Sequence, residues 1–417
     1  MKKILLCGLA ATLSAVAFAD EEKKDSIQEG FQFTTVDSVA ITPVKNQKNA
    51  GTCWSYSGMS FLESEALKKT GKVYDFSEMF VVLNTYMDRA EKSVRTHGDA
   101  SFAQGGSFVD DMFCLKNYGL VPDTEMPAGV MYGDTLSNHS ELSAMTDPLV
   151  RAAANAKKLQ FSPDGEPMWK KAVRAVHEIY LGKAPEEFTY EGKKYTPKSF
   201  AASTGLNADD YVSITSYTHH PYSTGENKGK GFIIEIQDNW RWGESLNVEL
   251  DDMMQIIDDA IKAGYTVLWG GDVSEDGFTR DGLGVYPDME APDAPGADQA
   301  RWLKLDRSAK NAEISKRPLP QKKVTADERQ RGYDNFETTD DHGMHLFGTA
   351  KDQLGNPYYM VKNSWGKTGK WDGIWYMTPE FIRAKTMNYV VNKAAISQAL
   401  REKYGIETAA PAKGKKK

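Results

Sequence analysis

The stretch Gln47-Lys48-Asn49-Ala50-Gly51-Thr52-Cys53-Trp54 places a cysteine where a helix is about to begin. Large and apolar residues recur through residues 52–70, and Gly71 is typical of a helix end. Unpaired backbone N–H groups and the helix dipole stabilise a thiolate at such a position, and the thiolate is the nucleophilic form of cysteine. Gln47 lies six positions earlier, so its amide and the Cys53 backbone N–H are expected to donate to the oxyanion of a tetrahedral intermediate.

A cysteine nucleophile needs a base, and the base needs a group that orients it. Both are supplied far downstream, where D-H-G-M at residues 341–344 leads into a predicted strand and V-K-N-S-W-G at residues 361–366 ends another. Neighbouring strands can hold His342 beside Asn363, with one imidazole nitrogen on the amide and the other facing Cys53. His345 competes for the role of base, but residues three apart on a strand point to opposite faces.

The blocks Q-x5-C-W-S-Y-S, D-H-G and N-S-W-G occur in this order, and the order resembles the papain-like cysteine peptidases. The resemblance implies that Cys53 is the nucleophile and that His342 acts as general base and acid. It further implies that Asn363 orients His342 and that Gln47 donates to the oxyanion.

The same resemblance assigns roles around the catalytic residues. Gly105 and Gly106 match a glycine pair along which the substrate backbone lies, because a side chain there would block the approach. Trp54 and Trp365 are supporting residues, and Trp365 is expected to shield the hydrogen bond between histidine and asparagine.

Within this superfamily, three further blocks resemble the bleomycin hydrolase and bacterial aminopeptidase C branch. They are Q-G-G-S-F with Y-G-L-V-P at residues 104–108 and 118–122, W-G-G-D-V at residues 269–273, and H-G-M at residues 342–344. The resemblance implies an α+β fold with two lobes, one helical and one like a β-barrel, and large helical insertions. It also implies an aminopeptidase that cleaves peptide substrates through a cysteine thioester, and a homo-oligomer, which is a hexamer in the relatives. An exported endopeptidase with an open cleft and a non-catalytic papain-like binding protein remain alternatives.

The first nineteen residues form a separate unit, with Lys2 and Lys3, an apolar run and an Ala17-Phe18-Ala19 ending. These are the parts of a secretory signal peptide, and the run is short for a membrane span. We therefore expect a periplasmic or secreted protein that has no membrane segment in its mature form. Cleavage lowers the formal net charge from −7 to −9, which disfavours a nucleic-acid partner. The expected organisation is a signal peptide at 1–19, an N-terminal segment at 20–42, a peptidase domain at 43–400 with insertions at about 128–330, and a tail at 401–417.

The remaining cysteine, histidine and acidic pairs are interpreted without a catalytic role. After cleavage two cysteines remain, and a Cys53–Cys114 disulfide is the alternative to a free nucleophile. His219-His220 has no third ligand at a useful spacing in the sequence, so a surface turn is expected rather than a metal site. No metal and no cofactor are expected. The pairs at residues 110–111 and 340–341 are interpreted as solvated acids, with Asp341 able to tune His342.

Hydrophobic periodicity predicts the following elements. Helices are expected at residues 52–70, 107–118, 142–181 and 250–263. Strands are expected at residues 211–216, 231–236, 266–269, 345–350, 358–363 and 373–377, and residues 287–327 are expected to be irregular.

Overall fold

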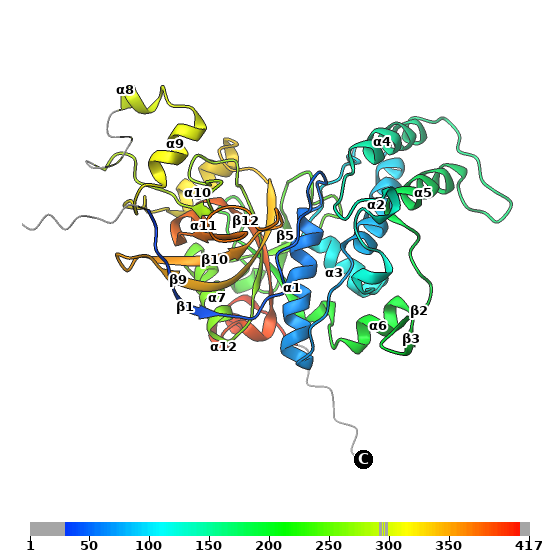
Figure 1. Cartoon of the computed structure of the whole chain (residues 1–417), viewed down its shortest axis with the longest axis horizontal. Coiled ribbons are helices and arrows are strands. Elements are labelled where there is room, and N and C mark those ends of the chain that lie inside the picture. Colours follow the sequence, from blue (N-terminus) through cyan, green and yellow to red (C-terminus); the bar gives the residue numbers. More distant parts are fainter. Residues whose placement is uncertain (1–29, 292–293, 295, 297–298, 409–417) are drawn as a thin grey trace, which may run out of the picture.

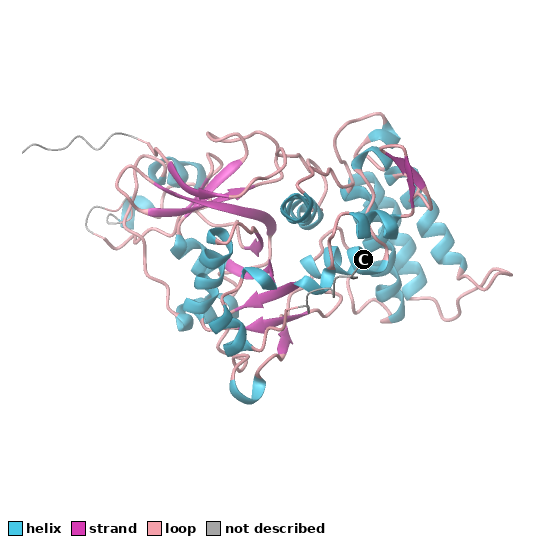
Figure 2. Ribbon diagram, turned by 90° about the horizontal axis from the view of Figure 1, so that it is seen from below, coloured by secondary structure: helices cyan, strands magenta, loops and turns pink. Residues whose placement is uncertain are grey.

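The computed structural model describes residues 30–291, 294, 296 and 299–408. The predicted signal peptide and the basic end of the tail lie outside these residues. The described chain forms a helical lobe and a lobe built on a sheet, and helix α1 (Cys53–Thr70) runs between them (Figure 1). Figure 2 shows the same helix end-on between the strands and the other helices.

The helical lobe follows α1 in the sequence and buries its own apolar core. Its helix α2 begins where the Ser77 hydroxyl accepts from the backbone N–H of Phe80 at 3.1 Å, a typical N-terminal cap. The described elements of this lobe are α2 (Glu78–Arg95), α3 (Phe108–Asn117), α4 (Ser140–Ala154), α5 (Met168–Leu181), β2 (Phe188–Tyr190), β3 (Lys193–Tyr195) and α6 (Pro197–Ser203).

The other lobe contains a mixed sheet, ten-stranded in the described part, in the order β5-β6-β4-β12-β7-β9-β10-β11-β8, with β1 paired to β9. Its strands are β1 (Thr34–Ser38), β4 (Tyr211–Thr215), β5 (Gly231–Ile233), β6 (Glu244–Asn247), β7 (Val267–Gly271), β8 (Leu283–Gly284), β9 (His342–Lys351), β10 (Pro357–Lys362), β11 (Ile374–Met377) and β12 (Thr386–Asn392). The helices of this lobe are α7 (Leu250–Lys262), α8 (Gln299–Trp302), α9 (Arg307–Ile314), α10 (Ala326–Asp334), α11 (Pro379–Lys385) and α12 (Gln398–Tyr404).

Helix α1 is buried without interruption from residue 54 to residue 66. A helix buried on every face belongs to the interior rather than to an amphipathic surface layer, which explains its place between the lobes. At Gly58 the helix packs so closely against α3 that no side chain fits, because a Cβ there would overlap the Asp111 carboxylate. Gly71 ends the helix in the left-handed conformation, as predicted.

The helices predicted at residues 107–118 and 250–263 are confirmed as α3 and α7, within one residue at each end. The single helix predicted over residues 142–181 is wrong. It is two helices, α4 and α5, because Gly165 at φ 85° and the flanking prolines turn the chain back between them. The segment 287–327 is not uniformly irregular, since it contains α9. None of the helices in the described ranges is long and apolar enough to cross a membrane.

Candidate active site

The predicted histidine and asparagine meet where two neighbouring strands present them. His342 is the first residue of β9, and Asn363 directly follows β10, the antiparallel neighbour of β9. Their side chains are both buried, and His342 Nε2 lies 2.7 Å from Asn363 Oδ1. The structure therefore brings together two residues that are twenty-one positions apart in the sequence.

The hydrogen bonds of Asn363 determine which nitrogen of His342 carries the proton. The backbone N–H of Ser364 donates to Asn363 Oδ1 at 2.7 Å, so the oxygen of this amide faces His342 as well. An oxygen only accepts, and His342 Nε2 must therefore donate to it. Nδ1 is left with the lone pair of the neutral ring, which makes it the basic nitrogen.

Trp365 packs against the His342 ring, which takes part in this hydrogen bond. Its ring lies 4.8 Å from the ring of His342, with 33° between the two planes. Trp365 is itself held by edge contacts with Phe278 and Trp375. An indole over the His342–Asn363 pair excludes water from it, and the bond is stronger in such surroundings than in solvent.

Cys53 is the first residue of α1 and lines one pocket with His342. The remaining lining residues of that pocket are Trp54, Gly106, Ser107, Phe108, Ile236, Asp238, Gly270, Asp340, Asp341, Gly343 and Asn388. Cys53 is partly accessible and Cys114 is buried, and both thiols are free. The alternative of a disulfide between them is therefore wrong.

The sequence predicts a thiolate at Cys53, whereas the surroundings of Cys53 in the pocket favour the neutral thiol. Burial raises the pKa of Cys53 to about 12, and the nearby carboxylates of Asp340 and Asp238 add to the shift against backbone hydrogen bonds from Gly343 and Trp54. Burial also lowers the pKa of His342 to about 4, although its bond to Asn363 opposes this. Both groups are neutral in the folded chain at neutral pH, because loss of hydration outweighs the backbone N–H groups.

Gln47 is buried beside the same turn. Its Oε1 accepts from the Ser364 hydroxyl at 2.5 Å, and its Nε2 donates to the backbone oxygen of Ala50 at 2.7 Å. These two bonds fix the amide with its nitrogen toward the turn that precedes Cys53. An amide nitrogen has two hydrogens, so a second donor remains for an oxyanion.

The glycine pair is explained by what lies against it. Gly106 is on the pocket wall, and a Cβ there would lie 2.7 Å from the Trp54 ring. Gly105 lies beneath Asp238, whose carboxylate a Cβ would overlap. Its carbonyl accepts from the fully buried Arg89, which also contacts Asp238 at 3.2 Å. Neither Arg89 nor Asp238 was predicted as part of the site, because no local pattern in the sequence marks them.

Two acidic groups face the nucleophile, and this was also not expected. The interpretation of Asp340 as a solvated acid is wrong, because it is half-buried and lines the pocket with Asp238. Burial, and then repulsion by Asp238 and Asp341, raise the pKa of Asp340 to about 7. Within the described residues its carboxylate makes no hydrogen bond or ion pair. Asp341 is exposed. As expected, its negative charge raises the pKa of His342 and so opposes the effect of burial.

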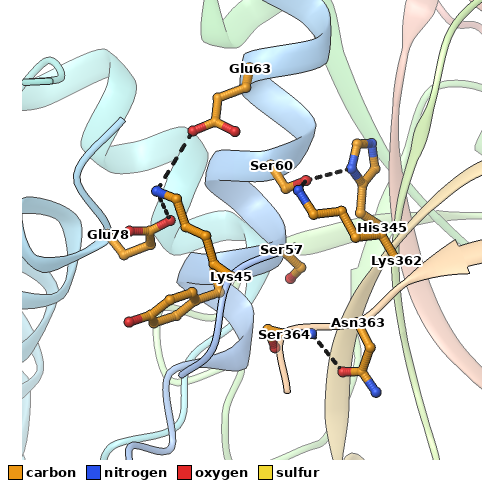
Figure 3. Close-up of a pocket in the computed structure, with 10 residues that line it drawn as sticks. Lys45, Ser57, Ser60, Glu63, Glu78, His345, Lys362, Asn363 and Ser364 are labelled. Atoms are coloured by element: carbon orange, nitrogen blue, oxygen red, sulfur yellow. Dashed lines mark hydrogen bonds and ion pairs between the residues drawn. The ribbon is translucent and has the colours of Figure 1, made fainter. Parts of the chain in front are cut away.

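His345 lies three residues after His342 on β9, so it is on the opposite face, and it is not among the residues that line the pocket with Cys53. Figure 3 shows it in a second pocket, where its Nδ1 is 2.8 Å from the Ser60 hydroxyl of α1. Burial, and then the neighbouring Lys362 ammonium, hold the pKa of His345 well below its ordinary value. Lys362 in turn donates to Ser60 at 2.8 Å. The structure therefore places His345 in the support of the site and leaves His342 to face Cys53.

The acids at the start of α3 are also structural. The interpretation of Asp110 and Asp111 as solvated is wrong, since both are fully buried. Asp110 accepts from Arg241 at 2.5 Å and from the indole of Trp240 at 3.1 Å. Trp240 and Arg241 lie 130 and 131 residues downstream of Asp110, beyond the reach of any local pattern.

Comparisons with known proteins agree with this geometry. Residues 28–90 match the papain family cysteine protease model, and residues 87–291 match the peptidase C1-like family model. Aminopeptidase G of Lactobacillus delbrueckii subsp. lactis is 24% identical over 397 residues, which are 86% of this chain and 83% of that protein. Aminopeptidase C of Lactococcus lactis subsp. cremoris is 24% identical over 401 residues, or 85% of this chain and 82% of that protein.

Two further relatives extend this pattern. Mitochondrial cysteine proteinase 1 of Saccharomyces cerevisiae is 24% identical over 421 residues, covering 90% of this chain and 80% of that protein. The crystal structure of PepW from Lactobacillus rhamnosis superposes with a TM-score of 0.63 at 20% identity, over 88% of this chain and 84% of that one. This likeness confirms the predicted α+β papain-like fold.

The chain is a papain-like cysteine peptidase. Within that family it belongs to the branch of the aminopeptidase C and bleomycin hydrolase type, as its sequence blocks predicted.

Proposed function

We propose that the protein is an exported cysteine aminopeptidase that removes residues from the N-termini of peptides. One observation carries the exopeptidase part: the pocket that holds Cys53 and His342 also holds the carboxylates of Asp238 and Asp340. A free peptide N-terminus is an ammonium group, and an opposite charge within the pocket favours it. The names of the aminopeptidase relatives support the same activity.

The chain's own residues divide the chemistry as follows. Cys53 Sγ attacks the scissile carbonyl while its proton moves to Nδ1 of His342, and Asn363 keeps the ring in place. The Gln47 amide and the Cys53 backbone N–H donate to the oxyanion. Collapse expels the amine with the proton from His342, and water then hydrolyses the thioester in the reverse sequence. Each of these assignments is part of the proposal.

The experiment uses matched peptides that differ only in an N-terminal acetyl group, followed by mass spectrometry of the products. We expect stepwise loss of N-terminal residues from the free peptide and little cleavage of the acetylated one. Cys53→Ala should abolish both. Equal internal cleavage of the two peptides would establish the endopeptidase alternative, and inertness of the parent toward all peptides would favour the binding protein.

Conservative variants test the acidic pocket. Asp238→Asn and Asp340→Asn keep the side-chain shape but remove charge, and each should raise KM for free peptides about tenfold, the usual loss for a charged contact of about 1.4 kcal/mol. Asp251→Asn, an exposed acid on α7, is the matched control and should leave KM unchanged. Unchanged KM in both pocket variants would contradict the proposed recognition of the ammonium group.

Export rests on residues 1–19, which have the pattern of a signal peptide. The mass of the mature protein isolated from its native compartment tests this part. We expect an N-terminus at Asp20, and a protein that retains Met1 inside the cell would contradict it.

A further inference from the structure

Three potential metal ligands converge outside the catalytic pocket. The ligand atoms of His219, His220 and Glu235 all lie within 4.8 Å of one another. Nε2 of His219 is 3.5 Å from one oxygen of Glu235, and Nε2 of His220 is 3.4 Å from the other. The sequence analysis found no third ligand for the histidine pair. The structure supplies it, because the chain returns through β5 and brings Glu235 back against the turn after β4.

A buried glutamine fixes the protonation of one ring. Gln330 Oε1 accepts from the backbone N–H groups of Thr218 and His219, and it lies 3.1 Å from His219 Nδ1. Gln330 Nε2 donates to Asp334 at 2.8 Å, so the amide cannot be reversed without losing these bonds. Nδ1 of His219 must therefore carry a hydrogen, which leaves Nε2, on the side of the Glu235 carboxylate, as the ring nitrogen that can bind an ion.

Two aromatic side chains, Phe232 and Tyr333, contact all three ligands. Phe232 stacks on the ring of His220 with centroids 4.3 Å apart, and Tyr333 stacks on His219 at 5.6 Å. The Tyr333 hydroxyl donates to Glu235 at 3.2 Å. Metal sites commonly orient their ligands by such outer hydrogen bonds and packing. This arrangement restricts all three ligand side chains before any ion arrives.

Two imidazole nitrogens and a carboxylate that converge on one point form a donor set that divalent transition metals prefer. Zinc binds imidazole nitrogen and carboxylate oxygen at about 2.0–2.2 Å, which separates ligand atoms around a tetrahedral ion by roughly 3.3–3.5 Å. The two nitrogen–oxygen distances in this cluster lie in that range, each to a different oxygen of Glu235. The three ligand atoms lie within 4.8 Å of one another, so small side-chain rotations bring them around one ion. We propose that His219, His220 and Glu235 bind a divalent transition-metal ion such as Zn²⁺, with the fourth position open to water.

The site has a structural connection to the catalytic pocket. Glu235 is followed by Ile236 and Asp238, which both line the pocket around Cys53. An ion that joins Glu235 to the 219–220 turn therefore restrains the segment that carries Asp238. This makes thermal stability a second readout of binding, besides the spectroscopic one.

The test uses the full mature chain with Cys53→Ala, which removes the accessible active-site thiol as a competing metal ligand and is independent of peptidase activity. After treatment with a chelator, the protein is titrated with Co²⁺ and then with Zn²⁺. We expect visible d–d bands of a four-coordinate Co²⁺ ion at one equivalent, their loss on adding Zn²⁺, and a rise in Tm. His219→Ala and Glu235→Gln should each weaken binding at least tenfold.

His97→Asn is the matched control, since it removes an exposed histidine far along the chain and should bind Co²⁺ like the parent. Circular dichroism identifies any variant that fails to fold, and His220→Asn then replaces it as a milder change. Absence of the Co²⁺ bands in the Cys53→Ala parent would overturn the proposal and leave an ion pair between Glu235 and protonated histidine. Equal binding by the parent and by a His219→Ala/His220→Ala variant would overturn it as well.

Discussion

Replacing His177 by leucine should make the folded protein less sensitive to acid. His177 is fully buried in the helical lobe, close to Tyr86 and Phe102, and neither of its ring nitrogens has a hydrogen-bond partner among the described residues. Burial, and then the neighbouring His139, lower its pKa from 6.5 to about 3. The ring therefore stays neutral in the folded chain under conditions in which the unfolded chain protonates it.

The sign and size of the effect follow from this difference. As pH falls below 6.5, the unfolded state takes up a proton that the folded state does not, so the free energy of unfolding decreases with falling pH. A depressed folded pKa of about 3 corresponds to a loss of about 2 kcal/mol at pH 5, growing to about 5 kcal/mol below pH 3. Leucine does not titrate, so His177→Leu should lose about 2 kcal/mol less than the parent between pH 8 and pH 5.

The assay is urea denaturation at pH 8 and pH 5, followed by tryptophan fluorescence, with Cys53→Ala in every protein to prevent self-digestion. The comparison uses the change between the two pH values, because leucine also alters packing at both. His97→Asn, which removes an exposed histidine, should behave like the parent. An equal loss of stability in His177→Leu and the parent would refute the reasoning, since His177 would then be protonated alike in both states.

Three further outcomes are expected. Asn363→Ala should lower kcat about tenfold to a hundredfold with little change in KM, because His342 loses the partner that fixes its ring; kinetics on a free peptide check this, and an unchanged kcat would contradict it. Arg241→Ala should cost about 3–5 kcal/mol in urea denaturation, because it leaves the fully buried Asp110 without its ion-pair partner; a loss below 1 kcal/mol would be inconsistent with that pairing. Gly106→Ala should cost about 1–3 kcal/mol by overlap with the Trp54 ring; a Tm equal to that of the parent would show that the contact relaxes without strain.

The sequence predicted those parts of the fold and site that local patterns specify. The start of α1 at Cys53 and its end at Gly71 have strong local signals, so the helix was predicted almost to the residue. The position of His342 beside Asn363 was predicted because adjacent antiparallel strands must align residues near their ends. That His345 faces away also followed from the alternation of side chains along a strand.

Features of the site that depend on contacts between distant parts of the sequence could not be predicted from local patterns. The acidity around Cys53 arises because Asp238 and Asp340 come from loops about a hundred residues apart. The expectation of a thiolate considered the helix end alone, whereas burial in the assembled pocket has the larger effect on the pKa of Cys53. Glu235 could not be recognised as a neighbour of His219 without the return of β5, whose three residues give too short a pattern to predict its register.

The pairing of β1 with β9 joins residues 34–38 to residues 348–351, so the first described strand closes on one from near the other end of the chain. Contacts of such sequence separation are slow to form, because a long loop must close before they contribute any stability. A chain emerging from the ribosome cannot assemble Cys53, His342 and Asn363 until nearly all of it has been made. The catalytic residues therefore come together only after most of the chain has been synthesised. A chain that stops before β9 lacks His342, the predicted base.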